Sequence, residues 1–473
     1  KNAAPVLIKG LKRLEYRGYD SAGIAVWNDG IKVSKKAGKV ADLEEQLTEV
    51  ELSGTVGIGH TRWATHGAPN DVNAHPHLSG NSKLAIIHNG IIENHSTVKE
   101  ELIRRGHKFI SDTDTEVLIH LIEEIQATEN ANLEEAVRIA LNQVSGAYAI
   151  VVISEDKPNE MIAARKGSPL VMGIGKGEYY MASDATPIVE YTRNVIYLDD
   201  GQMVRVDLDG YKITNIKDNT LHTPTIHELE ISLEQLEKGG FDHFMLKEIN
   251  EQPRAIYDTL RGRLLVEEGL IKMAGLDDNL SKFINAQRII IIACGTSWHA
   301  GLVGEYLIED LARLPVEVEY ASEFRYRNPV IKETDIVIPI SQSGETADTL
   351  AAIEMAKEKG AFIFGICNVP GSSIPRATHA GAYTHAGPEI GVASTKAFTT
   401  QLAVLTLIAA FLGNKRGSIS NSRYREILFN LHNAPAKIEQ ALKLETAIKD
   451  VAEEYKDVQN FLYLGRGANF PLA

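Results

Sequence analysis

The feature that most constrains the fold is a pattern repeated in the second half of the chain. A short apolar run is followed by a turn rich in glycine or serine, and then by a segment with helical spacing. The apolar runs are Ile289–Ala293, Asp335–Ile340 and Phe362–Ile366, and helical patterns follow the first two over Trp298–Ala312 and Thr346–Lys359. Apolar strands that alternate with helices indicate a parallel sheet covered on both faces. We therefore expect an α/β doubly wound parallel-sheet domain here.

The first half of the chain mixes alternating strands with two long helices. Apolar residues recur at helical spacing over Asp114–Gln126 and Leu133–Val144. Strands are predicted at Ser21–Trp27, Val56–Thr61, Leu84–His88, Ala147–Ile153, Met161–Ala164, Tyr179–Ala182 and Met203–Val206. This mixture is typical of an α+β domain.

The chain of 473 residues is long enough for several domains, since one domain takes roughly 100–200 residues. We expect a first domain over residues 1–218. Residues 219–240 lose the periodicity and end in Gly239-Gly240, which predicts a linker. A second domain, with leading helices, is expected over 241–430.

We expect the sequence to be a fragment that is cut at both ends. It begins with Lys1 and has neither an initiating methionine nor the apolar core of a signal peptide. Residues 431–473 are expected to form a helical connection and the start of a truncated second α/β unit. The strand of that unit is predicted at Phe461–Leu464, before the turn Gly465–Gly467, and too few residues follow for the helix that should cover it.

Composition excludes several classes of function. The chain has 49 basic and 63 acidic side chains, and this net charge of −14 argues against a nucleic-acid partner. The run Leu402–Leu412 is shorter than the ~20 residues that a membrane span requires, so we expect a buried core helix there. The two cysteines, Cys294 and Cys367, cannot form a disulfide framework and suit a reducing cytoplasm. A small-molecule role in the cytoplasm is favoured.

Two of the turns that follow predicted strands are rich in hydroxyl groups. They are Cys294-Gly295-Thr296-Ser297 and Ser341-Gln342-Ser343-Gly344-Glu345-Thr346. In an open parallel sheet such turns lie beyond the carboxyl ends of the strands, where helix N-termini favour anions. Hydroxyl groups and glycine N–H groups would then hold a phosphate without a lysine. The alternative is that these Ser and Thr residues only cap helices. The turns have neither a P-loop nor a dinucleotide-binding glycine pattern, so a nucleotide is disfavoured.

A third segment, Gly387–Lys396, leads into the apolar helix. Ser394 or Thr395 is a natural N-cap for that helix, and the small residues before it could line a sugar pocket. Capping alone would explain the segment equally well.

The N-terminal half contains residues suited to a different chemistry. Arg62 leaves a strand and could bind a carboxylate with its planar guanidinium group. Asn89 and Gly90 follow a strand and offer a side-chain amide next to a glycine N–H, which suits an oxyanion hole. Asp114, at a helix start, could pair with an ammonium group. Together they describe a free amino acid with a reactive side-chain carbonyl, as in glutamine. Singly, the same residues are explained by a surface charge, a hairpin turn and a helix-start acid.

Six histidines in this half raise the question of a metal. They are His60, His66, His75, His77, His88 and His95. None has the i,i+4 helical spacing of a zinc protease, and no cysteine lies nearby. We therefore expect hydrogen-bonded structural histidines, with no metal and no cofactor.

The order of these motifs resembles the glutamine–fructose-6-phosphate aminotransferase (isomerizing) family over essentially the whole chain. The matching segments are Tyr16–Gly23, His60–Gly67, His88–Gly90, Thr113–Glu116, Ser341–Thr346 and Gly391–Lys396. The resemblance implies an N-terminal-nucleophile (αββα) glutamine amidotransferase domain followed by sugar isomerase (SIS) domains. It also implies the conversion of D-fructose 6-phosphate and L-glutamine to D-glucosamine 6-phosphate and L-glutamate, in a homodimer.

The resemblance further implies roles for individual residues. Asn89 and Gly90 would form the oxyanion hole, and Arg62, Trp63, Thr65, His66 and Asp114 would bind glutamine, with Trp63 also gating an ammonia channel. The residues that would surround the sugar phosphate are Cys294, Gly295, Thr296, Ser297, Ser341, Gln342, Ser343, Thr346, Val392 and Ser394. The family's nucleophile is an N-terminal cysteine, which this sequence lacks, and Cys294 is poorly placed to replace it. We expect the chain as given to be inactive.

Two other classes are less consistent with the sequence. Another glutamine amidotransferase, such as a phosphoribosyl-pyrophosphate amidotransferase or an asparagine synthetase, would need a phosphoribosyl-binding acidic loop or an ATP-binding glycine loop after the linker. A non-catalytic SIS regulator that binds sugar phosphates would usually have a DNA-reading helix and a basic patch.

Overall fold

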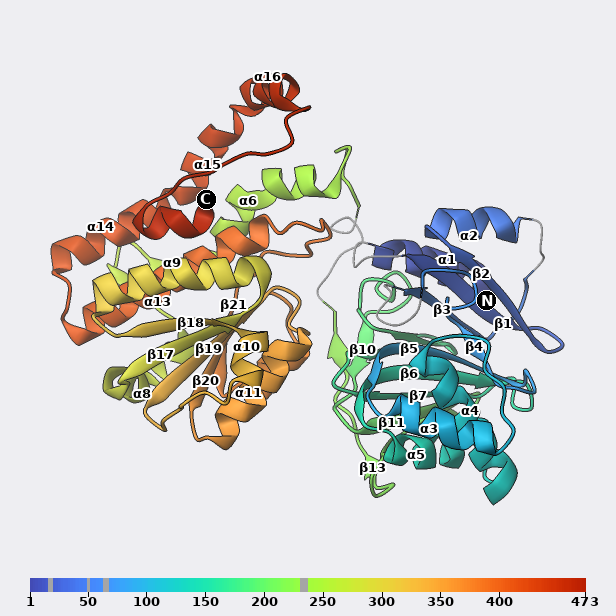
Figure 1. Ribbon diagram of the computed structural model, residues 1–473. Helices are drawn as coiled ribbons and strands as arrows, with labels where there is room; N and C mark the ends of the chain where they lie inside the picture. Colours follow the sequence, from blue (N-terminus) through green and yellow to red (C-terminus); the bar gives the residue numbers. More distant parts are fainter. Residues whose placement is uncertain (16–19, 49–51, 63–67, 230–236) are drawn as a thin grey trace. The chain divides into compact units, whose positions relative to one another are not determined.

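The computed structural model describes residues 1–15, 20–48, 52–62, 68–229 and 237–473. The chain divides into two compact units, Lys1–Leu233 and Glu234–Ala473. Each unit has its own sheets, as Figure 1 shows. Each unit also has its own hydrophobic cores.

The first unit consists mainly of antiparallel strands. Its helices are α1 (Ala3–Leu14), α2 (Val40–Leu47), α3 (His95–Arg104), α4 (Asp114–Glu129) and α5 (Leu133–Gln143). Its strands are β1 (Ser21–Trp27), β2 (Ile31–Ala37), β3 (Gly57–Arg62), β4 (His77–Leu78), β5 (Leu84–Ile92), β6 (Gly146–Ser154), β7 (Met161–Lys166), β8 (Val171–Ile174), β9 (Tyr179–Ala182), β10 (Asn194–Tyr197), β11 (Gln202–Asp207), β12 (Gly210–Asn215), β13 (Leu221–His222) and β14 (His227–Glu228).

These elements form four layers (Figure 1). Helices α1 and α2 pack on the three-stranded sheet β2-β1-β3, and helices α3 to α5 lie against the seven-stranded sheet β13-β12-β11-β7-β6-β5-β4. A four-stranded sheet, β14-β10-β8-β9, completes the unit. Apolar side chains from all three sheets form the core between the sheet layers. The order helix, sheet, sheet, helix is the αββα arrangement.

Strand β6 shows how the sequence specifies these layers. Successive side chains of a strand point to opposite faces of the sheet. Ile150 and Val152 accordingly pack with α4 and α5, whereas Ala149, Val151 and Ile153 enter the core between the sheets. Both faces of the central sheet are buried, which explains why this strand is apolar throughout.

The second unit contains a parallel sheet. Its helices are α6 (Phe244–Leu260), α7 (Ala274–Asp277), α8 (Leu280–Asn285), α9 (Gly295–Ala312), α10 (Ala321–Tyr326), α11 (Ala347–Glu358), α12 (Ser373–Ala377), α13 (Lys396–Arg416), α14 (Asn421–His432), α15 (Ala434–Leu442), α16 (Glu445–Tyr455) and the 3₁₀ helix η3 (Gly467–Leu472). Its strands are β15 (Leu264–Leu265), β16 (Leu270–Ile271), β17 (Arg288–Ala293), β18 (Val316–Tyr320), β19 (Asp335–Ser341), β20 (Phe362–Cys367) and β21 (Ala380–Tyr383).

Five of these strands are parallel, in the order β18-β17-β19-β20-β21, with helices on both faces. Ile289 and Ile291 of β17 pack with α9 and α13, and Ile290 and Ile292 pack with α10 and α11. Helix α13 is long and apolar enough to cross a membrane by length and composition alone. Most of its residues are buried in the core of the unit, as expected of a core helix.

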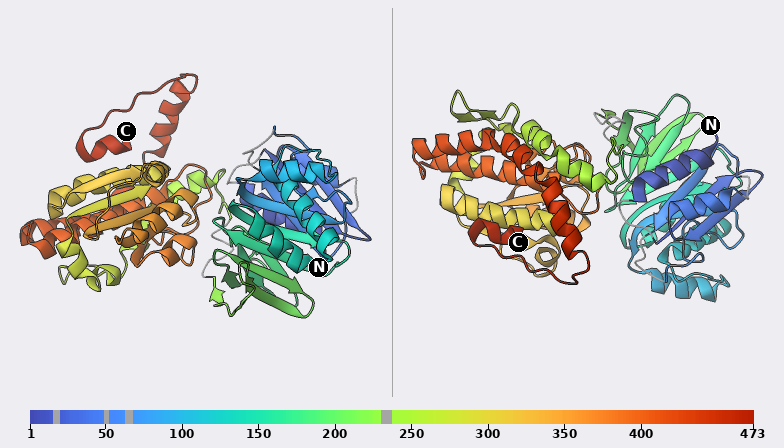
Figure 2. Two further views of the ribbon diagram at one scale, coloured as in Figure 1. Left: turned by 60° about the horizontal axis from the view of Figure 1, so that its bottom comes forward. Right: turned by 90° about the horizontal axis from the view of Figure 1, so that it is seen from above.

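The predicted fold class is confirmed for both units, and several segments differ from expectation. The segment 219–240, expected to be a linker, contributes β13 and β14 to two sheets of the first unit. Phe461–Leu464 was predicted as a strand but forms none, because it has no pairing partner in the described part of the chain. Its side chains are exposed. Helix α16 buries none of its residues and stands away from the sheet in the left view of Figure 2.

Candidate active site

The first unit contains a cavity of about 880 Å³ that is lined by residues of its three-stranded, four-stranded and seven-stranded sheets. Arg62 is the last residue of β3, Asn89 and Gly90 lie on β5, and Asp114 is the first residue of α4. All four line this cavity. The structure therefore brings together four residues that are up to 52 positions apart in the sequence.

Asn89 and Gly90 lie inside β5 and not in a hairpin turn after it. Strand β5 continues to Ile92, and Gly90 pairs with Tyr148 of β6. The φ angle of Gly90 is +137°, a conformation that side chains disfavour, and a Cβ at this position would overlap the carbonyl oxygen of Ala147. Only glycine fits here, and its backbone remains exposed toward the cavity.

His60 on β3 orients the side chain of Asn89. Its Nε2 lies 2.8 Å from Asn89 Oδ1. Because an amide oxygen only accepts, His60 must donate this hydrogen bond. Burial lowers the pKa of His60 to about 4, so the ring is neutral at pH 7 and its proton is on Nε2. In the described part of the chain the Asn89 Nδ2 group donates to no other residue, which leaves it available to a ligand.

Arg62 and Asp114 are both almost fully buried, although charged side chains are mostly exposed in proteins. Arg62 Nη1 lies 3.4 Å from the carbonyl oxygen of Ala68 and 4.0 Å from Asp20 Oδ1. Asp114 Oδ2 accepts a hydrogen bond of 2.8 Å from the backbone N–H of Ile92. These contacts fix one positive and one negative group in the wall of the same cavity.

The remaining predicted glutamine-binding residues are Trp63, Thr65 and His66, which lie outside the described residues. Of the histidines, His75, His77 and His88 are buried close to this cavity. His77 Nε2 lies 3.1 Å from Thr113 Oγ1, and His88 Nδ1 lies 3.0 Å from Thr115 Oγ1. These contacts anchor the start of α4.

In the second unit the hydroxyl-rich turns meet at one edge of the sheet. Strands β17 and β19 are parallel neighbours, so the turns Cys294–Ser297 and Ser341–Thr346 both lie at their carboxyl ends. Helix α9, after β17, packs on one face of the sheet, and helix α11, after β19, packs on the other. Open α/β sheets bind ligands at such a switch point.

The Ser341–Thr346 turn is held by its own side chains. Ser341 Oγ accepts from the Gly344 N–H at 3.0 Å and lies 3.3 Å from Thr346 Oγ1. Ser343 Oγ accepts from the Glu345 N–H at 3.2 Å. Gln342, Ser343 and Thr346 are half-buried, so they remain accessible at the surface of the turn.

The other turn is divided between surface and interior. Gly295 and Thr296 are exposed, and Cys294 is half-buried. Ser297 is buried, and its Oγ accepts a 3.0 Å hydrogen bond from Gln401 of α13. Thr296 is therefore better placed than Ser297 to meet a ligand.

The loop before α13 is organised around two buried carboxylates. Glu248 of α6 accepts from the N–H groups of Ile390 and Gly391. Glu389 accepts from the N–H groups of Thr395 and Ala397, at 2.9 and 3.0 Å.

The expected N-cap of α13 by Ser394 or Thr395 is wrong in one respect. Thr395 occupies the N-cap position, but the carboxylate of Glu389 does the capping. Ser394 Oγ donates to Glu389 at 2.9 Å. Val392, at the tip of the loop, is 90% exposed.

Both units of the chain resemble domains of known proteins. Residues 46–230 match the model of the glutamine amidotransferase domain, and residues 282–411 match the model of the SIS domain. The chain is 56% identical to glutamine–fructose-6-phosphate aminotransferase (isomerizing) of Bacteroides thetaiotaomicron, over all of this chain and 77% of that protein. It is 57% identical to the protein of the same name from Chlorobaculum tepidum, with the same coverage.

The chain belongs to the glutamine–fructose-6-phosphate aminotransferase (isomerizing) family. Among solved structures, the C-terminal domain of the glucosamine-fructose-6-phosphate aminotransferase from Francisella tularensis is 41% identical. The match covers 50% of this chain and 66% of that one, with a TM-score of 0.47.

Three groups of residues in this aminotransferase family member were not found from the sequence. His60 was considered only as a structural histidine, and its contact with Asn89 depends on the stacking of the sheet that contains β3 on the sheet that contains β5. Glu389 has no local signal, because its partners follow it by six and eight residues. His107, His120 and Glu123 form a cluster, and the helical spacing of Glu116, His120 and Glu123 could have indicated it.

Proposed function

We propose that this protein transfers ammonia from L-glutamine to D-fructose 6-phosphate, giving D-glucosamine 6-phosphate and L-glutamate. The observation that carries the proposal is the shared cavity of Arg62, Asn89, Gly90 and Asp114 in the first unit. Membership of the family supports the same activity.

In the glutamine half, each residue has a separate task. The Arg62 guanidinium group binds the substrate α-carboxylate, and the Asp114 carboxylate binds its α-ammonium group. The Asn89 Nδ2 group and the Gly90 N–H then donate to the side-chain carbonyl oxygen as it becomes an oxyanion. His60 acts as a positioning residue, because its hydrogen bond to Asn89 Oδ1 turns the Nδ2 group toward the substrate.

In the sugar half, the two turns at the β17/β19 edge hold the phosphate. Thr296, Ser341, Gln342, Ser343 and Thr346 supply neutral donors, together with Cys294, Gly295 and Ser297 of the first turn. Val392 and Ser394, from the loop before α13, border the sugar. The N-terminus of α11 adds a favourable field for the anion.

The glutaminase reaction also needs a nucleophile. Both cysteines of the sequence lie in the second unit. Cys367 is buried, and burial raises the pKa of its thiol to about 11, so it is protonated at pH 7. We propose neither of these cysteines as the nucleophile of the glutaminase reaction.

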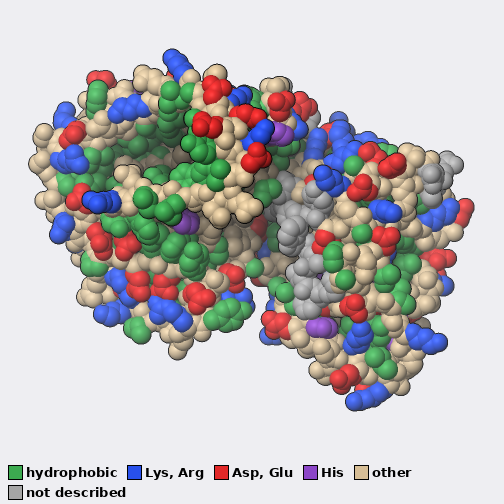
Figure 3. All heavy atoms as spheres, turned by 45° about the horizontal axis from the view of Figure 1, so that its top comes forward, with side chains coloured by type: hydrophobic (Ala, Val, Ile, Leu, Met, Phe, Trp, Pro, Cys, Tyr) green, Lys and Arg blue, Asp and Glu red, His purple; other side chains and the backbone are tan. Residues whose placement is uncertain are grey.

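The remaining assignments concern partners and organisation. We propose a cytoplasmic homodimer that acts on small molecules, with no membrane or nucleic-acid partner. On the face drawn in Figure 3, Lys and Arg side chains are interspersed with Asp and Glu side chains. We also propose a glutamine amidotransferase domain over 1–218, a segment over 219–240 that adds β13 and β14 to it and joins it to an SIS domain over 241–430, and a helical connection over 431–473.

Isothermal titration calorimetry tests the substrate assignment. The folded chain should bind L-glutamine and D-fructose 6-phosphate at one site each, and phosphoribosyl pyrophosphate should produce no heat. Arg62→Ala should abolish only the glutamine signal, and Ser343→Ala with Thr346→Ala only the sugar signal. Absence of heat with both ligands on folded protein would refute the proposal.

A further inference from the structure

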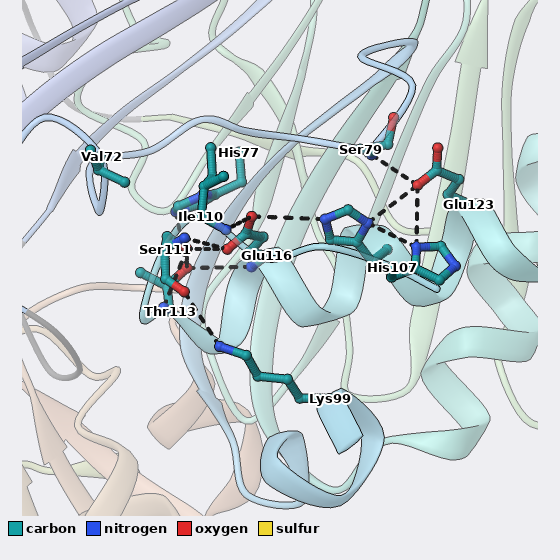
Figure 4. A network of polar contacts seen from close by, with 12 residues as sticks. Val72, His77, Ser79, Lys99, His107, Ile110, Ser111, Thr113, Glu116 and Glu123 are labelled. Atoms are coloured by element: carbon teal, nitrogen blue, oxygen red, sulfur yellow. Dashed lines mark hydrogen bonds and ion pairs between the residues drawn. The ribbon is translucent and has the colours of Figure 1, made fainter. Parts of the chain in front are cut away.

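A cluster of two histidines and one glutamate lies on the outer helical layer of the first unit. His120 and Glu123 belong to α4, and His107 lies in the segment between α3 and α4. The nearest nitrogen and oxygen atoms of these residues all lie within 4.8 Å of one another. Figure 4 shows the cluster and the polar contacts around it.

The spacing of the three atoms matches the coordination sphere of a small cation. His107 Nδ1 and His120 Nδ1 are 3.1 Å apart. Glu123 Oε2 lies 3.3 Å from His120 Nδ1 and 3.7 Å from His107 Nδ1. A tetrahedral zinc ion with ligands at roughly 2.0–2.1 Å has ligand-to-ligand distances of about 3.3 Å. The three atoms therefore form one face of such a tetrahedron with little rearrangement.

The outer nitrogen of each ring faces a carboxylate. His107 Nε2 lies 3.0 Å from Glu124 Oε2, and His120 Nε2 lies 3.8 Å from Glu116 Oε1. A carboxylate at Nε2 keeps the proton on that nitrogen and leaves the Nδ1 lone pair for a metal, an arrangement that is usual around histidine ligands. Both rings thus direct Nδ1 toward the same point.

The third ligand is also held in place. Glu123 Oε2 accepts from the Gly80 N–H at 2.8 Å, and its Oε1 accepts from the Asn81 N–H at 2.9 Å. Glu116 accepts from the N–H and the hydroxyl group of Ser111. The hydrogen bonds to Glu123 therefore fix its carboxylate beside the two rings, so that binding of a cation would cost little side-chain entropy.

Charge also favours a cation at this point. Glu116 and Glu123 are largely buried, and among the described residues their ion pairs are formed with histidines and not with Lys or Arg. Buried charges in proteins are paired or coordinate metals. Without a cation, the two Nδ1 atoms have to share a proton, because facing lone pairs at 3.1 Å repel.

We propose that His107, His120 and Glu123 form a zinc-class divalent cation site. Two imidazoles and a carboxylate are ligands that suit Zn²⁺. The side chains of His107 and Glu123 are partly exposed, so water can supply the fourth ligand. The site is separate from the glutamine cavity and joins α4 to the segments around His107 and Gly80. Its role is therefore structural. This proposal differs from the prediction of a metal-free chain. That prediction considered six other histidines and did not include His107 and His120.

Zinc and cobalt titrations of the chelator-stripped full chain test the site. We expect one tight equivalent of Zn²⁺ in competition with a chromophoric chelator, and the visible absorption bands of four-coordinate Co²⁺. His107→Gln and Glu123→Gln should each weaken binding by more than about 100-fold, and Glu124→Gln, which removes only an outer carboxylate, by about 10- to 100-fold. His222→Gln, at an exposed histidine of β13, is the matched control and should bind as the parent does.

These measurements distinguish a specific metal site from adventitious binding of Zn²⁺. Circular dichroism establishes that each variant is folded, and His107→Gln decides the question if Glu123→Gln does not fold, because His107 lies at the surface of the cluster. The proposal is overturned if the folded parent takes up no tight equivalent of Zn²⁺. It is equally overturned if His107→Gln binds Zn²⁺ with the affinity of the parent, or if Co²⁺ bound to the parent gives a six-coordinate spectrum.

Discussion

Gly90, a residue of the proposed oxyanion hole, has a backbone conformation that requires glycine. Its φ angle of +137° and the closeness of the Ala147 carbonyl both exclude a side chain. Gly90→Ala should therefore lower the free energy of unfolding of the first unit by about 3 kcal/mol, from strain and overlap together. Urea denaturation measures the change.

Gly210 provides the matched control for this substitution. Its φ angle is +144°, and a Cβ there would meet nothing within 4 Å. Gly210→Ala should therefore cost only the conformational strain, about 1 kcal/mol. Equal losses in the two variants would contradict the steric argument at Gly90.

Buried histidines make the first unit sensitive to acid. Burial lowers the pKa of His60 to about 4 and that of His77 to about 3. In the unfolded chain both titrate near 6.5. Below pH 6.5 the unfolded state thus binds protons that the folded state does not bind. The free energy of unfolding of the first unit therefore falls as pH decreases toward 4. Each such histidine contributes at most ~1.4 kcal/mol per pH unit.

Substitution of His77 tests this dependence. His77→Gln keeps a polar partner for Thr113 and removes the titrating group. The loss of stability of the first unit between pH 7 and pH 5 should be smaller in His77→Gln than in the parent, by about 2 kcal/mol. The exposed His222 is the control, and His222→Gln should keep the slope of the parent. An unchanged slope in His77→Gln would contradict the prediction.

At the scale of elements, strands buried on both faces were predictable and short or charged strands were not. β17, β19 and β20 are continuous apolar runs, and their locations follow from the sequence alone. β2 contains three lysines, and β14 has only two residues, so neither has a clear pattern. Both exist because a neighbouring strand completes their hydrogen bonds, which local sequence does not encode.

The residues of the candidate site also divide into those that the sequence predicts and those whose role depends on the fold. Arg62, Asn89 and Asp114 could be chosen from residue chemistry, because each is a group suited to one part of an amino acid. Their meeting in one cavity depends on the stacking of β3 on the sheet that contains β5, which no local pattern predicts. The same is true of Glu389, whose partners are fixed by the fold of the loop before α13.

Glu389 is the residue on which the start of α13 depends. Its carboxylate accepts two backbone N–H groups and the Ser394 hydroxyl group while it is buried. Glu389→Ala leaves these donors without a partner, so the free energy of unfolding of the second unit should fall by about 2 kcal/mol. The control is Glu354→Ala on the exposed face of α11, which should change it by less than about 0.5 kcal/mol. A neutral Glu389→Ala would show that water replaces the carboxylate.

At the scale of the molecule, the separate cores of the two units predict two unfolding transitions. Among the residues that the structure describes, the first unit has three hydrophobic clusters and the second has two, and each cluster lies within one unit. Cooperativity depends on shared packing, so scanning calorimetry should resolve two transitions. Gly90→Ala should lower one midpoint and Glu389→Ala the other, which assigns each transition to its unit.

Ligands then test whether each unit holds its own substrate. A ligand stabilises only the folded unit that binds it, by about 2.7 kcal/mol at a concentration of 100 Kd. L-glutamine should therefore raise the midpoint lowered by Gly90→Ala, and D-fructose 6-phosphate the midpoint lowered by Glu389→Ala. D-glutamine and inorganic phosphate serve as controls: the first has the wrong stereochemistry for Arg62 and Asp114, and the second lacks the sugar. A single transition raised by both substrates would mean that the units unfold together, and glutamine acting on the second transition would place its site outside the Arg62 cavity.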